Sequence, residues 1–300
     1  MDKPTVLRPS TPGGHSLILL AWLVAIGCAA ASVWVAELLP IAVAIALGAL
    51  AIYLVRHARF LGLLRSVENA LSRGDLPAAR TIAAPLLDRF PDLAPVQKIA
   101  ADVLYASGDP LSAASLYERA AKRVAHDRDL VVGLVASYAA LNKAGDSRRA
   151  AQLLPRDYDV RLALAWAELI ALGGDRTRGA RLADELMREL EVGHGAERTA
   201  MTNVLVAIAE AQRRNASAAR AALDVAERQR IVLEPADRAF IGYLGGVALR
   251  ELGLMGDAVR TFEAAMAEAP DTIGEALARR ERSHIPGSSD PSSEMSSTSD

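Results

Sequence analysis

Residues 71–109 read LSRGDLPAARTIAAPLLDRFPDLAPVQKIAADVLYASGD and contain a similar turn at each end. The two turns, LSRGD at 71–75 and YASGD at 105–109, lie 34 residues apart. The chain around them is rich in Ala and Leu and shows no sustained alternation of apolar and polar residues, so it predicts helices rather than strands. A fixed period of this kind indicates helix pairs that stack, because one pair cannot bury its apolar face alone.

Small residues and an aromatic residue recur where the two helices of a pair must approach each other. In the second and last units these positions hold Ala101, Ala113, Tyr117, Ala120, Gly246, Ala258, Phe262 and Ala265, and Pro270 ends the last unit. On these residues the chain resembles the tetratricopeptide repeat (TPR) superfamily over about 210 residues, from Phe60 to Pro270. In the first unit Ala83 stands where that family usually has a bulky aromatic residue.

The resemblance implies an α-solenoid. Five or six helix pairs are expected within a repeat domain at residues 57–283. A capping helix from Thr272 to Arg282 is expected at the end of this domain. A non-repeating helical bundle is the alternative. The expected units begin near Phe60, Ala94, Val131, Val160, Ala200 and Ala239.

Two apolar runs precede the repeats and predict a transmembrane helical hairpin at residues 16–56. Leu17 to Ala36 and Leu38 to Val55 are each long enough to cross a bilayer once, and Glu37 between them marks the turn. One alternative is a hydrophobic hairpin buried in a soluble domain. Another is a cleaved leader or a lipoprotein box at Cys28, although the chain stays apolar after that cysteine.

The basic residues around the hairpin predict its orientation. Lys3 and Arg8 precede it, Arg56 and Arg59 follow it, and the tip carries neither Lys nor Arg. By the positive-inside rule both termini face the cytoplasm. We therefore expect an integral membrane protein, assigned to a bacterial inner membrane, with a disordered arm at residues 1–15 and a disordered tail at residues 284–300.

The sequence offers no recognisable catalytic, cofactor or metal site. The five histidines do not lie at paired metal-ligand spacing, and the HExxH, GxxxxGK[ST] and GxSxG motifs are absent. A single Cys excludes a cysteine zinc cluster. The region between hairpin and tail has 32 bases and 31 acids, so it lacks the basic excess of a nucleic-acid binder. We expect a protein that is not an enzyme and needs no cofactor.

The TPR resemblance implies a concave groove lined by the first helix of each unit. Some TPR proteins hold a chaperone's C-terminal carboxylate there, but Asp102 stands where that clamp needs Asn and would repel it. The later units present an apolar strip instead, which either docks an amphipathic helix or packs internally or against a second copy. The groove residues expected are Lys98, Asp102, Tyr105, Arg161, Leu164, Glu168, Met201, Val204, Ile208, Phe240, Tyr243, Val247 and Arg250.

These observations predict a non-catalytic scaffold that is held at the cytoplasmic face of a membrane and binds protein partners of unspecified identity. Self-association is a further possibility for the apolar strip. The alternative function is a regulatory or structural subunit of a membrane enzyme or an envelope-assembly complex, in which the hairpin itself makes the specific contact.

Overall fold

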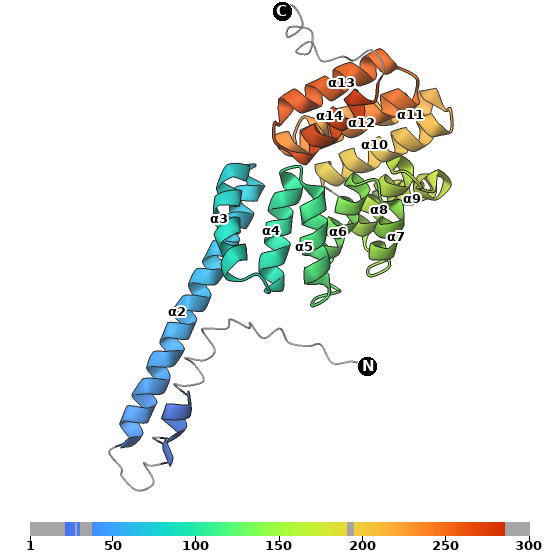
Figure 1. Ribbon diagram of the computed structural model, residues 1–300. Helices are drawn as coiled ribbons and strands as arrows, with labels where there is room; N and C mark the ends of the chain where they lie inside the picture. The colour runs from blue at the N-terminus through green and yellow to red at the C-terminus, as the bar shows by residue number, and fades with distance from the viewer. Residues whose placement is uncertain (1–21, 28, 31–37, 191–194, 286–300) are drawn as a thin grey trace, which may run out of the picture.

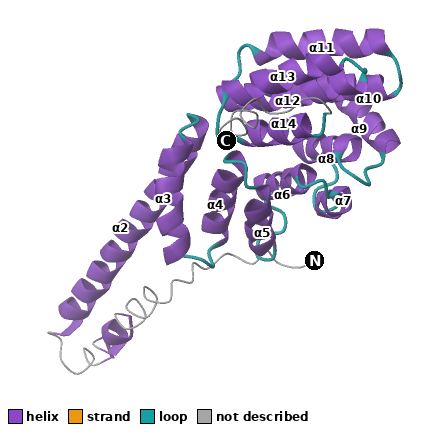
Figure 2. Cartoon of the chain, turned by 45° about the horizontal axis from the view of Figure 1, so that its top comes forward, coloured by secondary structure: helices purple, strands orange, loops and turns teal. Residues whose placement is uncertain are grey.

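A computed structural model of the chain describes residues 22–27, 29–30, 38–190 and 195–285 (Figure 1). The described residues form helices joined by turns, and none of them lies in a strand (Figure 2). The expectation of an all-α fold is confirmed for this part of the chain. The expected N-terminal arm, most of the first apolar run, the turn at Glu37 and nearly all of the expected tail lie outside the described residues.

The labelled helices form six consecutive pairs and one final helix. This is the upper of the two numbers predicted, and the final helix coincides with the expected cap. The pairs are α2 (Leu38–Ser72) with α3 (Leu76–Arg89), α4 (Ala94–Ala106) with α5 (Pro110–Ala121), α6 (Arg128–Ala140) with α7 (Ala144–Ala151), α8 (Tyr158–Ile170) with α9 (Arg176–Leu190), α10 (Ala196–Gln212) with α11 (Ala216–Arg230) and α12 (Pro235–Glu251) with α13 (Met255–Glu268); α14 (Ile273–Ser283) follows.

The turn inside each pair contains one residue with positive φ, which ends the first helix before the second begins. Four of these residues are glycines, whose missing Cβ permits the left-handed conformation without strain. In the first two pairs an aspartate follows and its carboxylate caps the second helix, as Asp75 does for the amide of Ala78 at 3.0 Å. The positive-φ residues are Gly74, Gly108, Asn142, Gly173, Arg214 and Gly253.

Close approach of neighbouring helices, within a pair and between pairs, explains the spacing of small and aromatic residues. A Cβ added at Gly246 of α12 would lie 2.4 Å from the ring of Phe262, which is fully buried on α13. Gly133 of α6 has the same relation to Tyr117 of α5, again at 2.4 Å. In both places the ring occupies the volume that a side chain would need, so glycine is required by packing.

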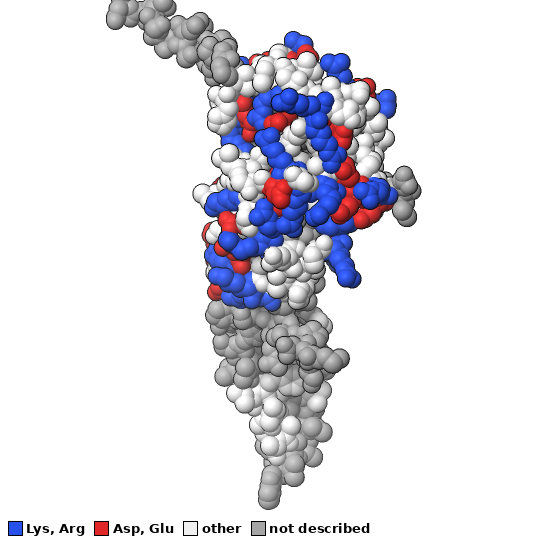
Figure 3. All heavy atoms as spheres, turned by 90° about the vertical axis from the view of Figure 1, so that its right-hand side faces the viewer, with Lys and Arg blue, Asp and Glu red and all other residues white. Residues whose placement is uncertain are grey.

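Helix α2 belongs to two environments. From Phe60 onward it packs against α3 and α4 in a cluster that includes Val67, which is fully buried. Before that point its apolar side chains are exposed, with Ile52 61% accessible. Val43–Ser72 is the one helix among the described residues that is long and apolar enough to cross a membrane. On the face shown in Figure 3, no charged side chain appears among the described atoms at the lower end of the molecule.

The array curves so that α14, the helix after the last unit, contacts the second and third units. Arg280 of α14 donates a hydrogen bond from Nη1 to the carbonyl oxygen of Ala140 at the end of α6, at 2.6 Å. The two residues are 140 positions apart in the sequence. A Cβ at Gly108, after α4, would lie 3.2 Å from Cβ of Ala276 on α14. Helix α14 therefore lies between α12 and the C-terminal ends of α4 and α6.

Candidate functional site

The structure places the apolar members of the expected groove in the core. Val204 and Ile208 of α10 and Tyr243 of α12 are fully buried, and Met201 is 8% exposed. Leu164 and Val247 are also buried. These side chains pack between neighbouring units, so they are not accessible to a partner in this conformation.

The charged groove residues of the fourth unit are held by ion pairs. The carboxylate of Glu168 is fully buried and accepts two hydrogen bonds from Arg148, at 2.7 and 2.8 Å, and one from the amide of Asp175 at 2.8 Å. Burial alone would raise the pKa of Glu168, but these donors outweigh it and the pKa is lowered. Arg161 is paired with Glu189. Both residues stabilise contacts between elements.

Helix α14 covers the groove residues of the last unit. Arg250 of α12 forms an ion pair with Glu281 of α14. A Cβ at Gly274 would lie 2.6 Å from the amide nitrogen of Phe240, so α14 begins in direct contact with α12. The ring of Phe240 meets Trp166 of α8 edge-on, with ring centroids 5.1 Å apart. The occupant of this part of the groove is thus the chain's own C-terminal helix.

Tyr105 of α4 lies at the same closure. Its pKa is raised by burial and, to a smaller extent, by the nearby hydroxyl of Tyr243. Tyr105 is half-buried, whereas Tyr243 is fully buried. The sequence did not predict that α14 would close this region.

Lys98 and Asp102, one turn apart on α4, are the most accessible charged pair of the expected groove. Lys98 Nζ lies 3.2 Å from Asp102 Oδ2, and the hydroxyl of Tyr117 donates to Asp102 Oδ1 at 2.5 Å. Burial raises the pKa of Asp102 more than Lys98 and Tyr117 lower it. For Lys98 the effect of burial is smaller than that of the carboxylates around it, so its pKa is raised.

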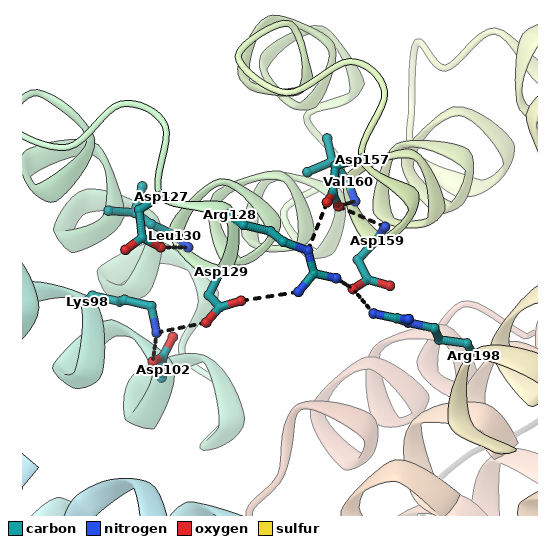
Figure 4. Close-up of polar contacts among 10 residues, drawn as sticks. All are labelled: Lys98, Asp102, Asp127, Arg128, Asp129, Leu130, Asp157, Asp159, Val160 and Arg198. Atoms are coloured by element: carbon teal, nitrogen blue, oxygen red, sulfur yellow. Dashed lines mark hydrogen bonds and ion pairs between the residues drawn. The ribbon is translucent and has the colours of Figure 1, made fainter. Parts of the chain in front are cut away.

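A chain of ion pairs extends from Lys98 across three further units (Figure 4). Its members lie on α4 and on or beside the first turns of α6, α8 and α10, where acidic side chains also favour the positive ends of the helix dipoles. Sequence reasoning missed this chain, although acidic residues at helix starts were a usable signal. Its contacts are Lys98–Asp129 (3.8 Å), Arg128–Asp129 (3.5 Å), Arg128–Asp157 (2.8 Å), Arg128–Asp159 and Arg198–Asp159 (2.6 Å).

A shallow hollow of about 120 Å³ lies beside Lys98, between α2, α4 and the loop before α6. Its walls are mainly apolar and include Leu64, Pro95, Ile99 and Val124. The described residues contain no group of three or more His, Cys, Asp or Glu side chains placed to hold a metal ion. The arrangement offers a charged and apolar surface suited to contact with another molecule.

Comparison with known proteins identifies the fold. No protein-family model matches the chain, and no curated protein matches it in sequence. A solved structure of a tetratricopeptide repeat protein from Parabacteroides merdae is similar, with a TM-score of 0.51 and 13% identity over 86% of this chain and 98% of that one. The TPR domain of P58(IPK) aligns with a TM-score of 0.35 and 15% identity over 91% of this chain and 80% of that one.

The first of these similarities assigns a TPR-type solenoid to this chain, and at this identity it assigns the fold alone. The resemblance inferred from the small and aromatic residues is supported.

Proposed function

We propose that this chain is a membrane-anchored, non-catalytic adaptor whose TPR-type array binds protein partners at the cytoplasmic face of a bacterial inner membrane. One observation carries the proposal. From Val43 to Val55 helix α2 exposes large apolar side chains; it contains the one candidate membrane span among the described residues and ends as the first helix of the array. Soluble proteins rarely expose a continuous apolar surface of this kind to water.

The orientation follows from charge. Arg56 and Arg59 come directly after the apolar part of α2, and placing them in the cytoplasm satisfies the positive-inside rule. The test is alkaline extraction of membranes together with C-terminal reporter fusions. Full-length protein should stay in the membrane pellet, with a C-terminal fluorescent protein active and a C-terminal alkaline phosphatase inactive. Release into the supernatant, or an active phosphatase, would contradict the proposal.

The proposed docking surface is the part of the groove that α14 does not cover, where Lys98 and Asp102 are each about one quarter exposed. Tyr105, on the same helix, forms its half-buried part. The side chains of Met201, Val204, Ile208 and Tyr243 are buried and are not part of this surface.

A photo-cross-linking amino acid at Lys98 tests this surface in intact membranes. We expect a discrete adduct from Lys98 and none from the matched position Arg220, which is exposed on α11. Equal labelling from both positions would show that this surface has no special role.

The position of α14 favours a second candidate function. Because α14 covers part of the groove, the membrane hairpin itself can be the specific contact, as in a regulatory or structural subunit of a membrane enzyme or assembly complex. Replacing residues 16–56 with an unrelated hairpin of equal length separates the two functions. Loss of the Lys98 adduct would favour the hairpin, and retention would favour the array.

A further inference from the structure

Helix α2 connects the candidate membrane span to the array without a flexible joint. It is a single helix from Leu38 to Ser72. Side chains at positions 52, 54 and 55 are exposed, whereas Phe60 and Leu64 already pack against the first repeat cluster. Since an α-helix rises about 1.5 Å per residue, positions along α2 measure how far each part of the array lies from the end of the span.

This measure places the end of α3 close to the membrane surface. The ring of Phe60 meets the ring of Phe90 edge-on, with centroids 5.4 Å apart, and the guanidinium of Arg89 lies 5.4 Å from the centroid of Phe90. Phe60 is four residues beyond Arg56, which corresponds to about 6 Å along the helix. The headgroup layer on each side of a bilayer is about 5–8 Å thick, so Arg89 is within reach of it.

The loop between α5 and α6 is the next part of the array above the membrane. Leu64 of α2 and Val124 of this loop line the same hollow, so the loop lies beside a position about 12 Å beyond Arg56. Long basic side chains extend several ångströms further, and electrostatic attraction to a charged surface acts over about 8–10 Å. Lys122 on this loop is exposed.

We define the membrane-facing edge as residues 56–65, 88–92 and 118–127. It contains seven basic and four acidic residues, a net charge of +3. The whole region between hairpin and tail, with 32 bases and 31 acids, has a net charge of only +1, so its remainder is at −2. The basic excess is therefore concentrated at this edge. Asp92 and Arg123, both within this edge, form an ion pair at 3.3 Å, which leaves its net charge of +3 unchanged.

We propose that the membrane-facing edge rests on anionic lipid headgroups, which hold the array against the bilayer in a fixed orientation. This rests on the proposed function, because it requires that α2 crosses the membrane. Arg56 and Arg59 contact the headgroups from α2, and Arg89 and Lys122 contact them from the array. Each basic residue near an anionic surface strengthens attachment about fivefold, so loss of two should weaken it by at least tenfold.

The test uses the full chain, with Cys28→Ser, in nanodiscs of phosphatidylcholine alone or mixed with phosphatidylglycerol. A fluorophore on His126→Cys reports proximity to the surface through quenching by a nitroxide on the lipid headgroup. We expect quenching in the mixed lipid, little in phosphatidylcholine or high salt, and loss of it in Arg89→Gln with Lys122→Gln. The matched variant, Arg188→Gln with Arg220→Gln on α9 and α11, should behave as the unmodified chain.

Equal quenching of the His126 probe in both lipids would overturn the proposal, as would quenching that the Arg89 and Lys122 changes do not affect. The proposal would also fail if the fluorescence of this probe changed only when an acidic protein was added. A second fluorophore, at Leu50→Cys, separates this failure from failure of the anchor. It should be quenched by a nitroxide on the acyl chain in both lipids. If the Leu50 probe is not quenched, α2 does not cross the membrane and both proposals fail; if only the His126 probe is unaffected by lipid charge, the lipid contact alone fails.

Discussion

Adjacent glycines on α12 should respond in opposite directions to the same substitution. A Cβ at Gly245 would meet its nearest neighbour, Glu227 Oε1, at 3.7 Å, which is ordinary contact. A Cβ at Gly246 would meet three ring atoms of Phe262 at 2.4, 2.6 and 2.9 Å. Because Phe262 is fully buried, its ring has no free volume into which it can move.

The magnitudes follow from these distances. Replacing a helical glycine by alanine stabilises a helix by about 0.5–1 kcal/mol, and Gly245→Ala should show this gain. Carbon atoms normally approach to about 3.5 Å, so Gly246→Ala requires a shift of roughly 1 Å in a packed core. Overpacking of this kind costs about 1–3 kcal/mol. The two variants should therefore differ by about 1–3 kcal/mol, with Gly246→Ala the less stable.

Urea and thermal unfolding of the full-length protein in detergent, followed by circular dichroism, measure this difference. For a domain of this size, 1 kcal/mol corresponds to about 2–4 °C in Tm. Phe262→Leu provides the internal check, because in that background the cost of Gly246→Ala should largely disappear. If Gly246→Ala raises Tm as much as Gly245→Ala does, the ring does not fill the space next to Gly246 and the packing argument is refuted.

Three further predictions concern buried charge, closure and backbone strain. Glu168→Gln should destabilise the array by about 2–4 kcal/mol, since it removes a buried charge that Arg148 requires. Because the pKa of Glu168 is lowered in the folded state, the stability that its ion pair contributes should be full above about pH 4.5 and fall below it, which unfolding measurements across acidic pH would show. Arg280→Ala should speed amide hydrogen exchange in the last turn of α6, whereas Arg279→Ala, with an exposed arginine, should not. Arg214→Gly should stabilise by up to about 1 kcal/mol in urea unfolding, because φ at this position is +62°.

The local features of this fold were predictable because they depend on few residues. A turn such as Gly108-Asp109 combines a left-handed residue with a helix cap, and both requirements are visible in the sequence. Ala94 was predicted as the start of a unit and is the first residue of α4. The third and fifth units were harder to delimit, because Asn142 and Arg214 take the positive-φ position that glycine fills elsewhere.

The candidate site was predicted less well because burial in a solenoid depends on how far the array curves. The first helix of a TPR-type unit faces the concave side, and this suggested that Met201, Val204 and Ile208 would line a groove. Curvature is the sum of small rotations between units, which individual residues do not reveal. In the structure the curvature brings α14 to the second unit, and Lys98 and Asp102 are the groove residues that stay partly exposed beside it.

The closure changes how stability is distributed in this array. In an open solenoid each unit contacts only its neighbours, so a weak terminal unit can fray without affecting distant ones. Here the hydrogen bond from Arg280 to Ala140 and the contact of α14 with Gly108 link units that are far apart in sequence. Loop-closure entropy grows only slowly with chain length, so such a long-range link is not prohibitively costly. A partner that reached the groove residues of the last unit would have to displace α14 and break these links to the second and third units, whereas a partner at Lys98 would leave them intact.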